Sequence, residues 1–409
     1  MANSVLPEDL MICILSRLPV KTIIRFKSVC KPWFHLLSTP EFKKLHQAQF
    51  SSDPKNQSFI VHTFDSESKN QSFILQTFDR QCSEPKHQFS IFNIESGEKE
   101  PTILDHPFDH AQKIELYSVG CCNGLVCIRR GHEIVLWNPA MKLSKTIPLK
   151  DCAPFKMASL GFGYDANGDD FKVVMILTNI NGDPIDITSA EIYSVNLGSW
   201  ISIDTGIQFS WCPEKNNLIV NGNMYWDNVL ADGDMVLVCF DVLELVFKFV
   251  PVSTTYWDGL DEETETKWRD VKLDDWNGAL STLIINFEIE ENVGPPGTKC
   301  CARVECFEVR VFDDIERIWR KKHTFGPIEV DGFRVLRCIK NEKILGLTSY
   351  DKLIVLDLET GSVKELFDGA SADANIGNMF EVYGYTESLT YINGMEKVVV
   401  KNEQNDIDD

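Results

Sequence analysis

The first fifty residues carry hydrophobic side chains at the spacing of short amphipathic helices. One set recurs every four positions and consists of Leu6, Leu10, Ile14 and Leu18. Pro7 suits the first position of a helix and Pro19 cannot continue one, so we predict a helix from Pro7 to about Arg17. Further short helices are predicted over residues 21–29, from about Pro32 and from Pro40. Helices this short cannot bury all their apolar side chains among themselves, so part of the apolar surface needs a partner.

From about Phe89 onward the pattern changes to short apolar or alternating runs, which are typical of β-strands. Six Asn-Gly dipeptides punctuate these runs and begin at Asn123, Asn167, Asn181, Asn221, Asn277 and Asn393. Asn-Gly is the favoured pair for a type I′ hairpin turn, so we predict an all-β meander. A meander of this length must close on itself to avoid exposed edges, and a β-propeller fits best. The sequence shows no blade repeat as regular as the kelch or WD40 signatures.

A short tandem duplication lies between the two regions. Residues 55–65 and 69–79 match at nine of eleven positions. Each copy predicts a short strand, Phe59–Val61 and Phe73–Leu75, and the two strands could form a hairpin. We therefore divide the chain into four parts: a helical module (1–50), a linker region with the duplication (51–88), a β domain (89–400) and an acidic tail (401–409).

Charge and composition exclude several classes of function. The 409 residues carry a formal net charge of -21, which would repel the phosphates of nucleic acids. Residues 1–50 hold seven basic and three acidic side chains, so this part carries +4 and the remainder carries -25. The chain has neither an 18-residue apolar run nor a signal sequence, so we expect no membrane span and a cytoplasmic or nuclear location. The thirteen cysteines are then expected to be reduced.

The helical region resembles the F-box family at many adjacent positions. The matching segments are Leu6–Leu10 (LPEDL), Ile14–Lys21 (ILSRLPVK) and Arg25–Trp33 (RFKSVCKPW). The resemblance implies a three-helix module that binds a Skp-family adaptor, which in turn holds a cullin and a RING subunit. Carried over position by position, the adaptor contacts would come from Leu6, Pro7, Leu10, Ile14, Leu15, Leu18 and Pro19. For any one of these leucines a place in the module's own core is an equally good interpretation, and Phe26 and Trp33 fit the core better.

The β region resembles the F-box-associated domain of plants, which includes the S-locus F-box proteins. The matching segments are 122–127 (CNGLVC), 136–140 (LWNPA), 161–165 (GFGYD), 171–174 (FKVV), 191–195 (EIYSV), 199–200 (SW), 221–226 (NGNMYW), 239–241 (CFD) and 356–361 (LDLETG). Their glycines fit turns or close backbone approaches, and Trp137, Trp200 and Trp226 fit large buried anchors. These motifs therefore describe the scaffold and not a binding site.

The candidate metal sites in the sequence are weak. Asp165–Asp169 begins like a calcium loop, but Asp170 and Ile176 stand where such a loop needs glycine and glutamate, so an Asn-Gly hairpin is favoured. Asp105–His110 contains two histidines and two aspartates, but Pro107 breaks the helix that would place them on one face. We expect no cofactor, no metal and no catalytic residue.

Together these patterns predict an α+β multidomain chain, with a helical F-box followed by a large all-β, kelch-like propeller. The predicted function is the substrate-recognition subunit of a Skp-cullin-F-box ubiquitin ligase. Loops of the β domain would bind an unidentified protein target, and ubiquitination would follow from proximity. Two alternatives stay open: a propeller enzyme like a glycoside hydrolase, which needs two facing carboxylates, and an F-box scaffold outside the ligase. A helix-turn-helix reader of nucleic acid is disfavoured because no helix presents a polar recognition face.

Overall fold

The computed structural model describes most of the chain, in fourteen stretches. These are residues 7–64, 87–94, 101–108, 116–151, 156–179, 186–205, 218–229, 235–252, 267–289, 302–331, 333–339, 342–348, 352–368 and 379–398. The chain divides into two compact units, residues 1–149 with 375–409 and residues 150–374. Within the described stretches, no helix is long and apolar enough to cross a membrane.

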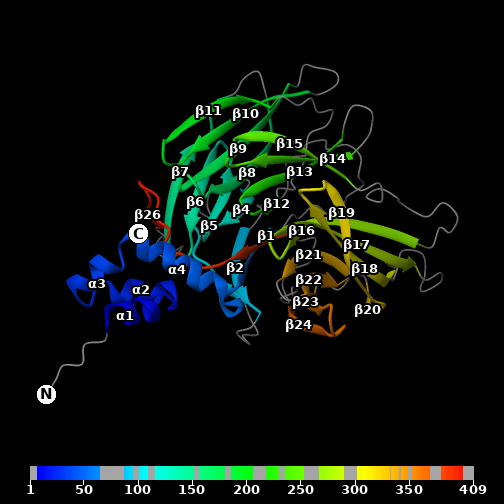
Figure 1. Cartoon of the computed structure of the whole chain (residues 1–409), viewed down its shortest axis with the longest axis horizontal. Coiled ribbons are helices and arrows are strands. Elements are labelled where there is room, and N and C mark those ends of the chain that lie inside the picture. Colours follow the sequence, from blue (N-terminus) through cyan, green and yellow to red (C-terminus); the bar gives the residue numbers. More distant parts are fainter. Residues whose placement is uncertain are drawn as a thin grey trace, which may run out of the picture. The chain divides into compact units, whose positions relative to one another are not determined.

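The N-terminal part is helical, as predicted. Its helices are α1 (Glu8–Leu15), α2 (Val20–Phe26), α3 (Lys31–Leu36) and α4 (Pro40–Ser52), followed by the 3-10 turn η1 (Pro54–Asn56). Pro7 and Pro19 directly precede α1 and α2, and Thr39 Oγ1 caps α4 by accepting a hydrogen bond from Phe42 N (3.2 Å). We call Pro7–Ser52 the helical module, which is drawn in blue in Figure 1.

The rest of the described chain forms six antiparallel sheets, the blades of a six-bladed β-propeller. Unit one holds blade A, with β25 (Met379–Tyr385), β1 (Ser58–Phe64), β2 (His87–Asn93) and β3 (Thr102–Ile103) in that order. It also holds blade B, with β4 (Leu116–Cys122), β5 (Leu125–Arg130), β6 (Glu133–Asn138), β7 (Leu143–Pro148) and the edge strand β26 (Glu396–Lys397). The predicted all-β propeller is therefore confirmed.

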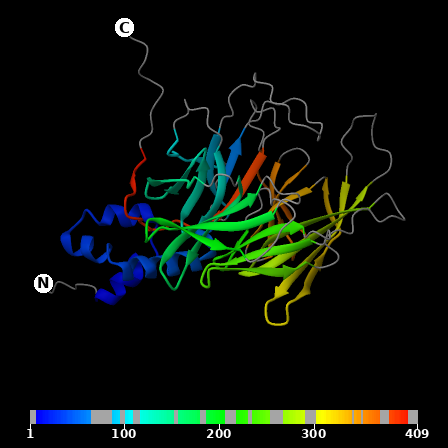
Figure 2. The ribbon, with the colours of Figure 1, turned by 90° about the horizontal axis from the view of Figure 1, so that it is seen from above.

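The second unit holds the other four blades, which follow one another in chain order from green to orange in Figure 2. Blade C has β8 (Lys156–Asp165), β9 (Asp170–Asn179), β10 (Asp186–Ser194) and β11 (Ser199–Asp204). Blade D has β12 (Leu218–Val220), β13 (Asn223–Val229), β14 (Met235–Asp241) and β15 (Val246–Pro251). Blade E has β16 (Lys267–Trp276), β17 (Ala279–Ile289), β18 (Ala302–Asp313), β19 (Ile318–Phe325) and the added strand β20 (Ile328–Asp331). Blade F has β21 (Phe333–Ile339), β22 (Lys343–Thr348), β23 (Lys352–Asp357) and β24 (Val363–Asp368).

Blade A is built from both ends of the chain. Strand β25 pairs with β1 in the register Ser58↔Tyr385 to Phe64↔Met379, and β2 pairs with the other edge of β1. The first copy of the duplication therefore contains a strand, as predicted, but β1 makes its hydrogen bonds with β2 and β25 and not in the expected hairpin between the copies. The second copy, residues 69–79, lies outside the described residues.

The Asn-Gly turns agree with the prediction in three places. Positive φ at both central residues, which defines type I′, occurs at 123–124, 221–222 and 277–278, each time between the first two strands of a blade. The turn at 167–168 also joins two strands, but its positive φ lies at Asp169. Gly394 has a positive φ without Asn393 and lies outside any hairpin, so the prediction was wrong there, and Asn181 lies outside the described residues.

A blade repeat that the sequence does not show as a motif occurs in the turn between the third and fourth strands. In blades B to F an oxygen of the last residue of the third strand accepts a hydrogen bond from the backbone N–H three positions later, at 2.9–3.1 Å. The acceptors are Asn138, Ser194, Asp241, Asp313 and Asp357. The residue four positions after the acceptor has a positive φ, and these residues are Lys142, Gly198, Leu245, Arg317 and Gly361. The geometry repeats in all five blades, while the residue types repeat only in part: the acceptor is Asp in blades D, E and F and differs in B and C.

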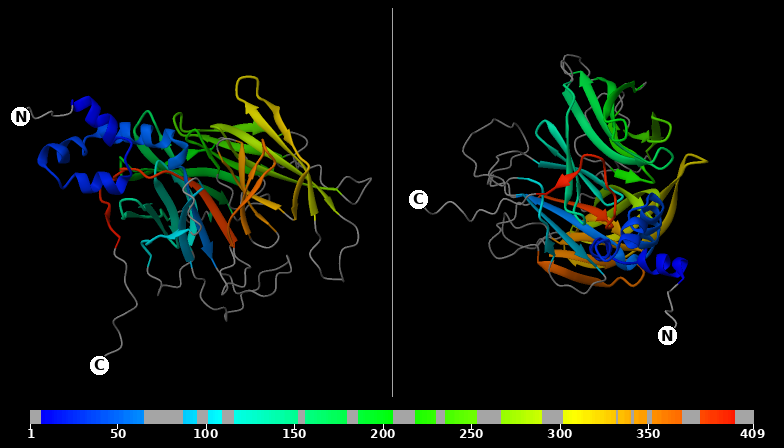
Figure 3. Two further views of the ribbon diagram at one scale, coloured as in Figure 1. Left: turned by 90° about the horizontal axis from the view of Figure 1, so that it is seen from below. Right: turned by 90° about the vertical axis from the view of Figure 1, so that its left-hand side faces the viewer.

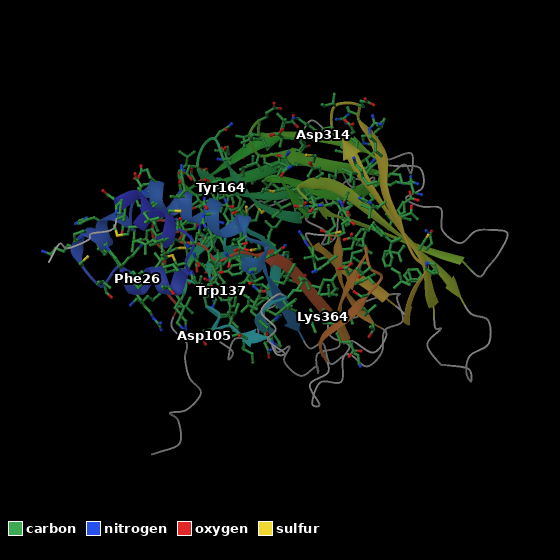
Figure 4. The ribbon with its side chains drawn as sticks, turned by 60° about the horizontal axis from the view of Figure 1, so that its bottom comes forward. Phe26, Asp105, Trp137, Tyr164, Asp314 and Lys364 are labelled. Atoms are coloured by element: carbon green, nitrogen blue, oxygen red, sulfur yellow. The ribbon has the colours of Figure 1, made fainter. Side chains whose placement is uncertain are left out.

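Apolar side chains between neighbouring sheets form the core. Trp137 and Trp226 are fully buried anchors, as predicted, and Trp137 is labelled in Figure 4. Trp200 is only half-buried and packs against Tyr193 at the edge of blade C, because it lies on an outer strand. Gly161 meets the predicted close approach, since a Cβ there would lie 2.5 Å from Met224 Sδ.

Candidate functional site

Large apolar side chains are exposed along the helical module. They come from α1, α2, the α2–α3 connection, α3 and α4, and are Leu10, Ile14, Ile24, Val29, Phe34 and Leu45. Among the described residues, no other stretch of about forty positions exposes as many. Single exposed apolar residues are ordinary, whereas such a concentration on a small module marks an interaction surface.

The residues that the sequence proposed for this surface divide into two sets. Leu10 and Ile14 are 48% exposed and lie four residues apart on one face of α1, and Pro7 and Pro19 are exposed beside its ends. Leu15 is only 3% exposed and belongs to the module core, against which the half-buried Leu18 also packs. Leu6 lies outside the described residues.

Sequence reasoning did not single out Ile24, Val29 and Phe34 as exposed. In Ile23-Ile24 and Trp33-Phe34 two adjacent apolar residues compete for the core, and only packing decides which one turns outward. Phe26 and Trp33 pack against the module core with ring centroids 5.1 Å apart, in agreement with their predicted role, and Phe26 is labelled in Figure 4.

A buried histidine connects two of the helical elements that carry the exposed apolar side chains. His46 of α4 is fully buried, and its Nε2–H donates to the carbonyl oxygen of Leu18 (2.8 Å) in the α1–α2 connection. Its ring also stacks on Phe50 (5.2 Å). Burial lowers the pKa of His46, more than the Leu18 carbonyl raises it, so the imidazole is held neutral. This contact links α4 to the connection between α1 and α2.

The helical module is basic, and most of its charge is accessible. The exposed basic side chains are Arg17, Lys21, Arg25, Lys31 and Lys44. Burial and the neighbouring charge of Lys43 lower the pKa of Lys27, which packs partly into the module. A partner that covers the exposed apolar residues should therefore carry an apolar groove with acidic surroundings.

Of the two metal candidates from the sequence, the structure describes the first fully and the second only in part. Asp165 Oδ1 accepts hydrogen bonds from Asn167 N (3.0 Å) and Gly168 N (2.8 Å), so this segment is the predicted hairpin turn. His106 is buried against Phe89 and Phe108. Asp109 and His110 lie outside the described residues. In the part of the chain that the structure describes, no three His, Cys, Asp or Glu side chains are placed to hold a metal ion.

Three carboxylates are buried among the described residues, and each is bound by neighbouring scaffold groups. Asp170 binds Lys172 Nζ and Ser194 Oγ, both at 2.6 Å, and Glu191 binds Lys150 Nζ (2.8 Å). Asp274 accepts a hydrogen bond from Cys338 N (2.6 Å) and lies 3.3 Å from Arg337 Nε. Such occupied carboxylates give no support to the glycoside hydrolase alternative.

Sequence reasoning also did not predict a row of hydrogen-bonded polar side chains within blade A. His62 is fully buried, with Nδ1 3.3 Å from Glu381 Oε2 and Nε2 3.0 Å from His87 Nδ1. Its ring stacks on Phe89 with the centroids 4.4 Å apart. These three polar side chains link β25, β1 and β2, and thus connect strands from both ends of the sequence.

Comparison with known proteins finds two family models that match different parts of the chain. A family model described as the F-box domain matches residues 4–45, and one described as the F-box associated beta propeller domain matches residues 88–265. A protein of Arabidopsis thaliana named as an F-box protein, At3g16210, is 27% identical over 255 residues, 60% of each chain. The F-box/kelch-repeat protein At3g23880 of the same plant is 26% identical over 60% of this chain and 65% of its own.

The chain spans less than two thirds of the length of either relative. Among solved structures, TolB from Acinetobacter baumannii is 9% identical, with a TM-score of 0.36, over 80% of this chain and 69% of that chain. A likeness this low carries no argument about activity.

Proposed function

Because this chain is an F-box protein with an F-box-associated β-propeller domain, we propose that it is the target-recognition subunit of a Skp-cullin-F-box ubiquitin ligase. The helical module binds a Skp-family adaptor, which is held by a cullin with its RING subunit. The propeller binds a protein target. The observation that carries the proposal is the concentration of exposed apolar side chains on the helical module.

The exposed side chains supply a useful binding energy. Burial of a Leu, Ile or Phe side chain stabilises by roughly 1.5–3 kcal/mol, so a side chain that is about half exposed still has roughly 1 kcal/mol to gain. Leu10, Ile14 and Phe34 together would then contribute roughly 3 kcal/mol, or about a hundredfold in affinity. The exposed basic side chains of the module would increase the rate of association with an acidic partner.

The blades of the propeller support target binding as a scaffold. Their strands bury large apolar side chains. Specificity would come from the loops, which tolerate changes of sequence better than a packed scaffold does. The chain needs no catalytic group for this role, because a ubiquitin-loaded enzyme held beside the target acts through effective concentration. The target would be ubiquitinated and degraded in the cytoplasm or nucleus.

The test is co-purification with a plant Skp-family adaptor and cullin. We compare the intact chain with Leu10→Ala/Ile14→Ala and with the control Leu243→Ala, whose side chain is similarly exposed (53%) but lies in blade D. We expect the intact chain and the control to bind, and the double variant to lose about thirtyfold or more in affinity. Absence of binding by the folded intact chain, or equal binding by all three chains, would overturn the proposal.

Abundance of a bound target separates the ligase from a scaffold. A target captured by the propeller should accumulate in cells when Leu10→Ala/Ile14→Ala replaces the intact chain. A partner that binds but keeps the same abundance would favour the F-box scaffold outside the ligase.

A further inference from the structure

The core of the helical module is completed by residues from outside the module. Besides Leu15, Val20 and Ile23, it contains Leu389, which is almost fully buried. Ala140 and Met141, from the turn between β6 and β7 of blade B, pack against the same core. We predicted from the sequence that part of the apolar surface of these helices needs a partner. Other segments of the same chain cover some of that surface.

Residues 386–390 carry this contact, and we call them the C-terminal clamp. They follow β25 of blade A and precede β26, whose residues pair with β7 at the edge of blade B. In Figure 3 the red C-terminal segment passes beside the blue helices. The clamp therefore connects β25 of blade A with the edge strand β26 of blade B.

One set of side chains binds the clamp to blade B. Ser388 Oγ (2.8 Å) and Thr390 Oγ1 (3.2 Å) both donate to the carbonyl oxygen of Asn123 in the β4–β5 turn. The fully buried Asn138 donates through Nδ2 to the carbonyl oxygens of Ser388 (3.1 Å) and Thr390 (2.9 Å). The side chains of Ser388 and Thr390 thus face blade B.

The odd-numbered residues of the clamp contact the helical module. Glu387 Oε2 accepts a hydrogen bond from Val20 N (3.1 Å), the first residue of α2, and Leu389 enters the core between the helices. Successive side chains of an extended chain point to opposite sides, so five residues suffice to bind two surfaces at once. As the first residue of α2, Val20 has no acceptor for its N–H inside its own helix, and Glu387 supplies one.

We infer that the C-terminal clamp is a positioning device, which fixes the helical module on blade B through Glu387 and Leu389. The strand that completes blade A leads directly into the clamp, so the module is fixed only when β25 has paired with β1. This inference rests on the proposed function for its purpose: a fixed module would hold a bound target at one distance from the ubiquitin-loaded enzyme.

Hydrogen exchange of the full chain tests the contact. In Glu387→Ala/Leu389→Ala, we expect amides of α1 to α3 to exchange at least about tenfold faster, while amides of β5 and β6 keep their rates. Glu387→Gln keeps an oxygen acceptor and should restore slow exchange at Val20 N. Glu396→Ala is the matched control, because Glu396 follows the clamp and its side chain is exposed.

Single-molecule fluorescence tests position rather than stability. A donor at exposed Arg25 of α2 and an acceptor at exposed Thr146 of β7 are attached through genetically encoded azides, which leaves the cysteines unmodified. We expect one narrow transfer efficiency in the intact chain and in Glu396→Ala, and a broad distribution in the double variant and, less strongly, in Glu387→Ala.

Two results would overturn the inference. One is an unchanged distribution in both clamp variants. The other is equal acceleration of exchange in blade B and in the helices, because the clamp would then stabilise the propeller without positioning the module. Adaptor binding is measured on the same chains: its absence from the intact chain would refute the proposed function and leave the exchange and fluorescence results standing.

Discussion

Substitution of Gly124 by alanine tests the contact between the C-terminal clamp and the β4–β5 turn of blade B. Gly124 has a φ of +74°, where a side chain costs roughly 1–2 kcal/mol. A Cβ at this position would lie 2.4 Å from Ser388 Oγ and 2.9 Å from the carbonyl oxygen of Thr386, so the turn or the clamp must move. Such overpacking costs roughly 1–3 kcal/mol. We expect Gly124→Ala to lower the free energy of unfolding by roughly 2–5 kcal/mol.

The control for this variant is Gly361→Ala in the β23–β24 turn. Gly361 has a similar φ of +67°, but nothing lies within 4 Å of an added Cβ. It should therefore lose only the backbone cost of roughly 1–2 kcal/mol. The difference between the two variants isolates the close approach of turn and clamp.

The assay is urea unfolding of the full chain, followed by far-ultraviolet circular dichroism, with hydrogen exchange of the helices measured at low urea. Gly124→Ala should unfold at lower urea than Gly361→Ala and should also accelerate exchange in α1 to α3. If both variants lose the same stability, the clamp does not lie against the β4–β5 turn and the reasoning fails.

Three further outcomes follow from buried groups. Burial lowers the folded-state pKa of His46 below its ordinary value of 6.5, so the stability of the helical module should fall as the pH drops through and below 6.5. In urea titrations, His46→Phe should flatten this pH dependence. The variant should also cost roughly 1–3 kcal/mol at neutral pH, because the Leu18 carbonyl oxygen loses its hydrogen-bond donor. Asp274→Ala should cost roughly 3–5 kcal/mol in the same assay, because Arg337 and a backbone N–H lose their buried acceptor; equal stability would refute this. Trp226→Ala should cost roughly 3–5 kcal/mol and the half-buried Trp200→Ala clearly less, and the reverse order would contradict the assigned packing.

The local features of the fold were predictable because they depend on neighbours in the chain. Pro7 and Pro19 precede α1 and α2, since proline lacks the N–H that a helix interior needs. Asn-Gly adopts positive φ at both residues where two strands need a tight turn, as at 221–222. The same dipeptide at 393–394 serves another turn, because its surroundings are not two pairing strands.

The candidate site was predictable only in part. Periodicity placed Leu10, Ile14 and Leu15 on one helix, but a stripe of four-residue spacing does not say which flank turns inward. Packing of Leu15 against α2 and the clamp, with Leu10 left outward, is decided by the neighbouring elements. Residue types in the turns after the third strands are shared by only some of the blades, so a repeat of backbone geometry was not recognised from the sequence.

The sequence alone determined the element types, three of the Asn-Gly turns, the position of the helical module and its family resemblance, since each rests on short-range spacing or residue identity. Tertiary structure decided which strands share a sheet and which apolar residues stay exposed. The pairing of β1 with β25 joins residues more than three hundred positions apart, and Leu389 completes a core that begins at Leu15. No local pattern encodes such contacts, because they depend on closing the propeller and on the burial that closure makes possible.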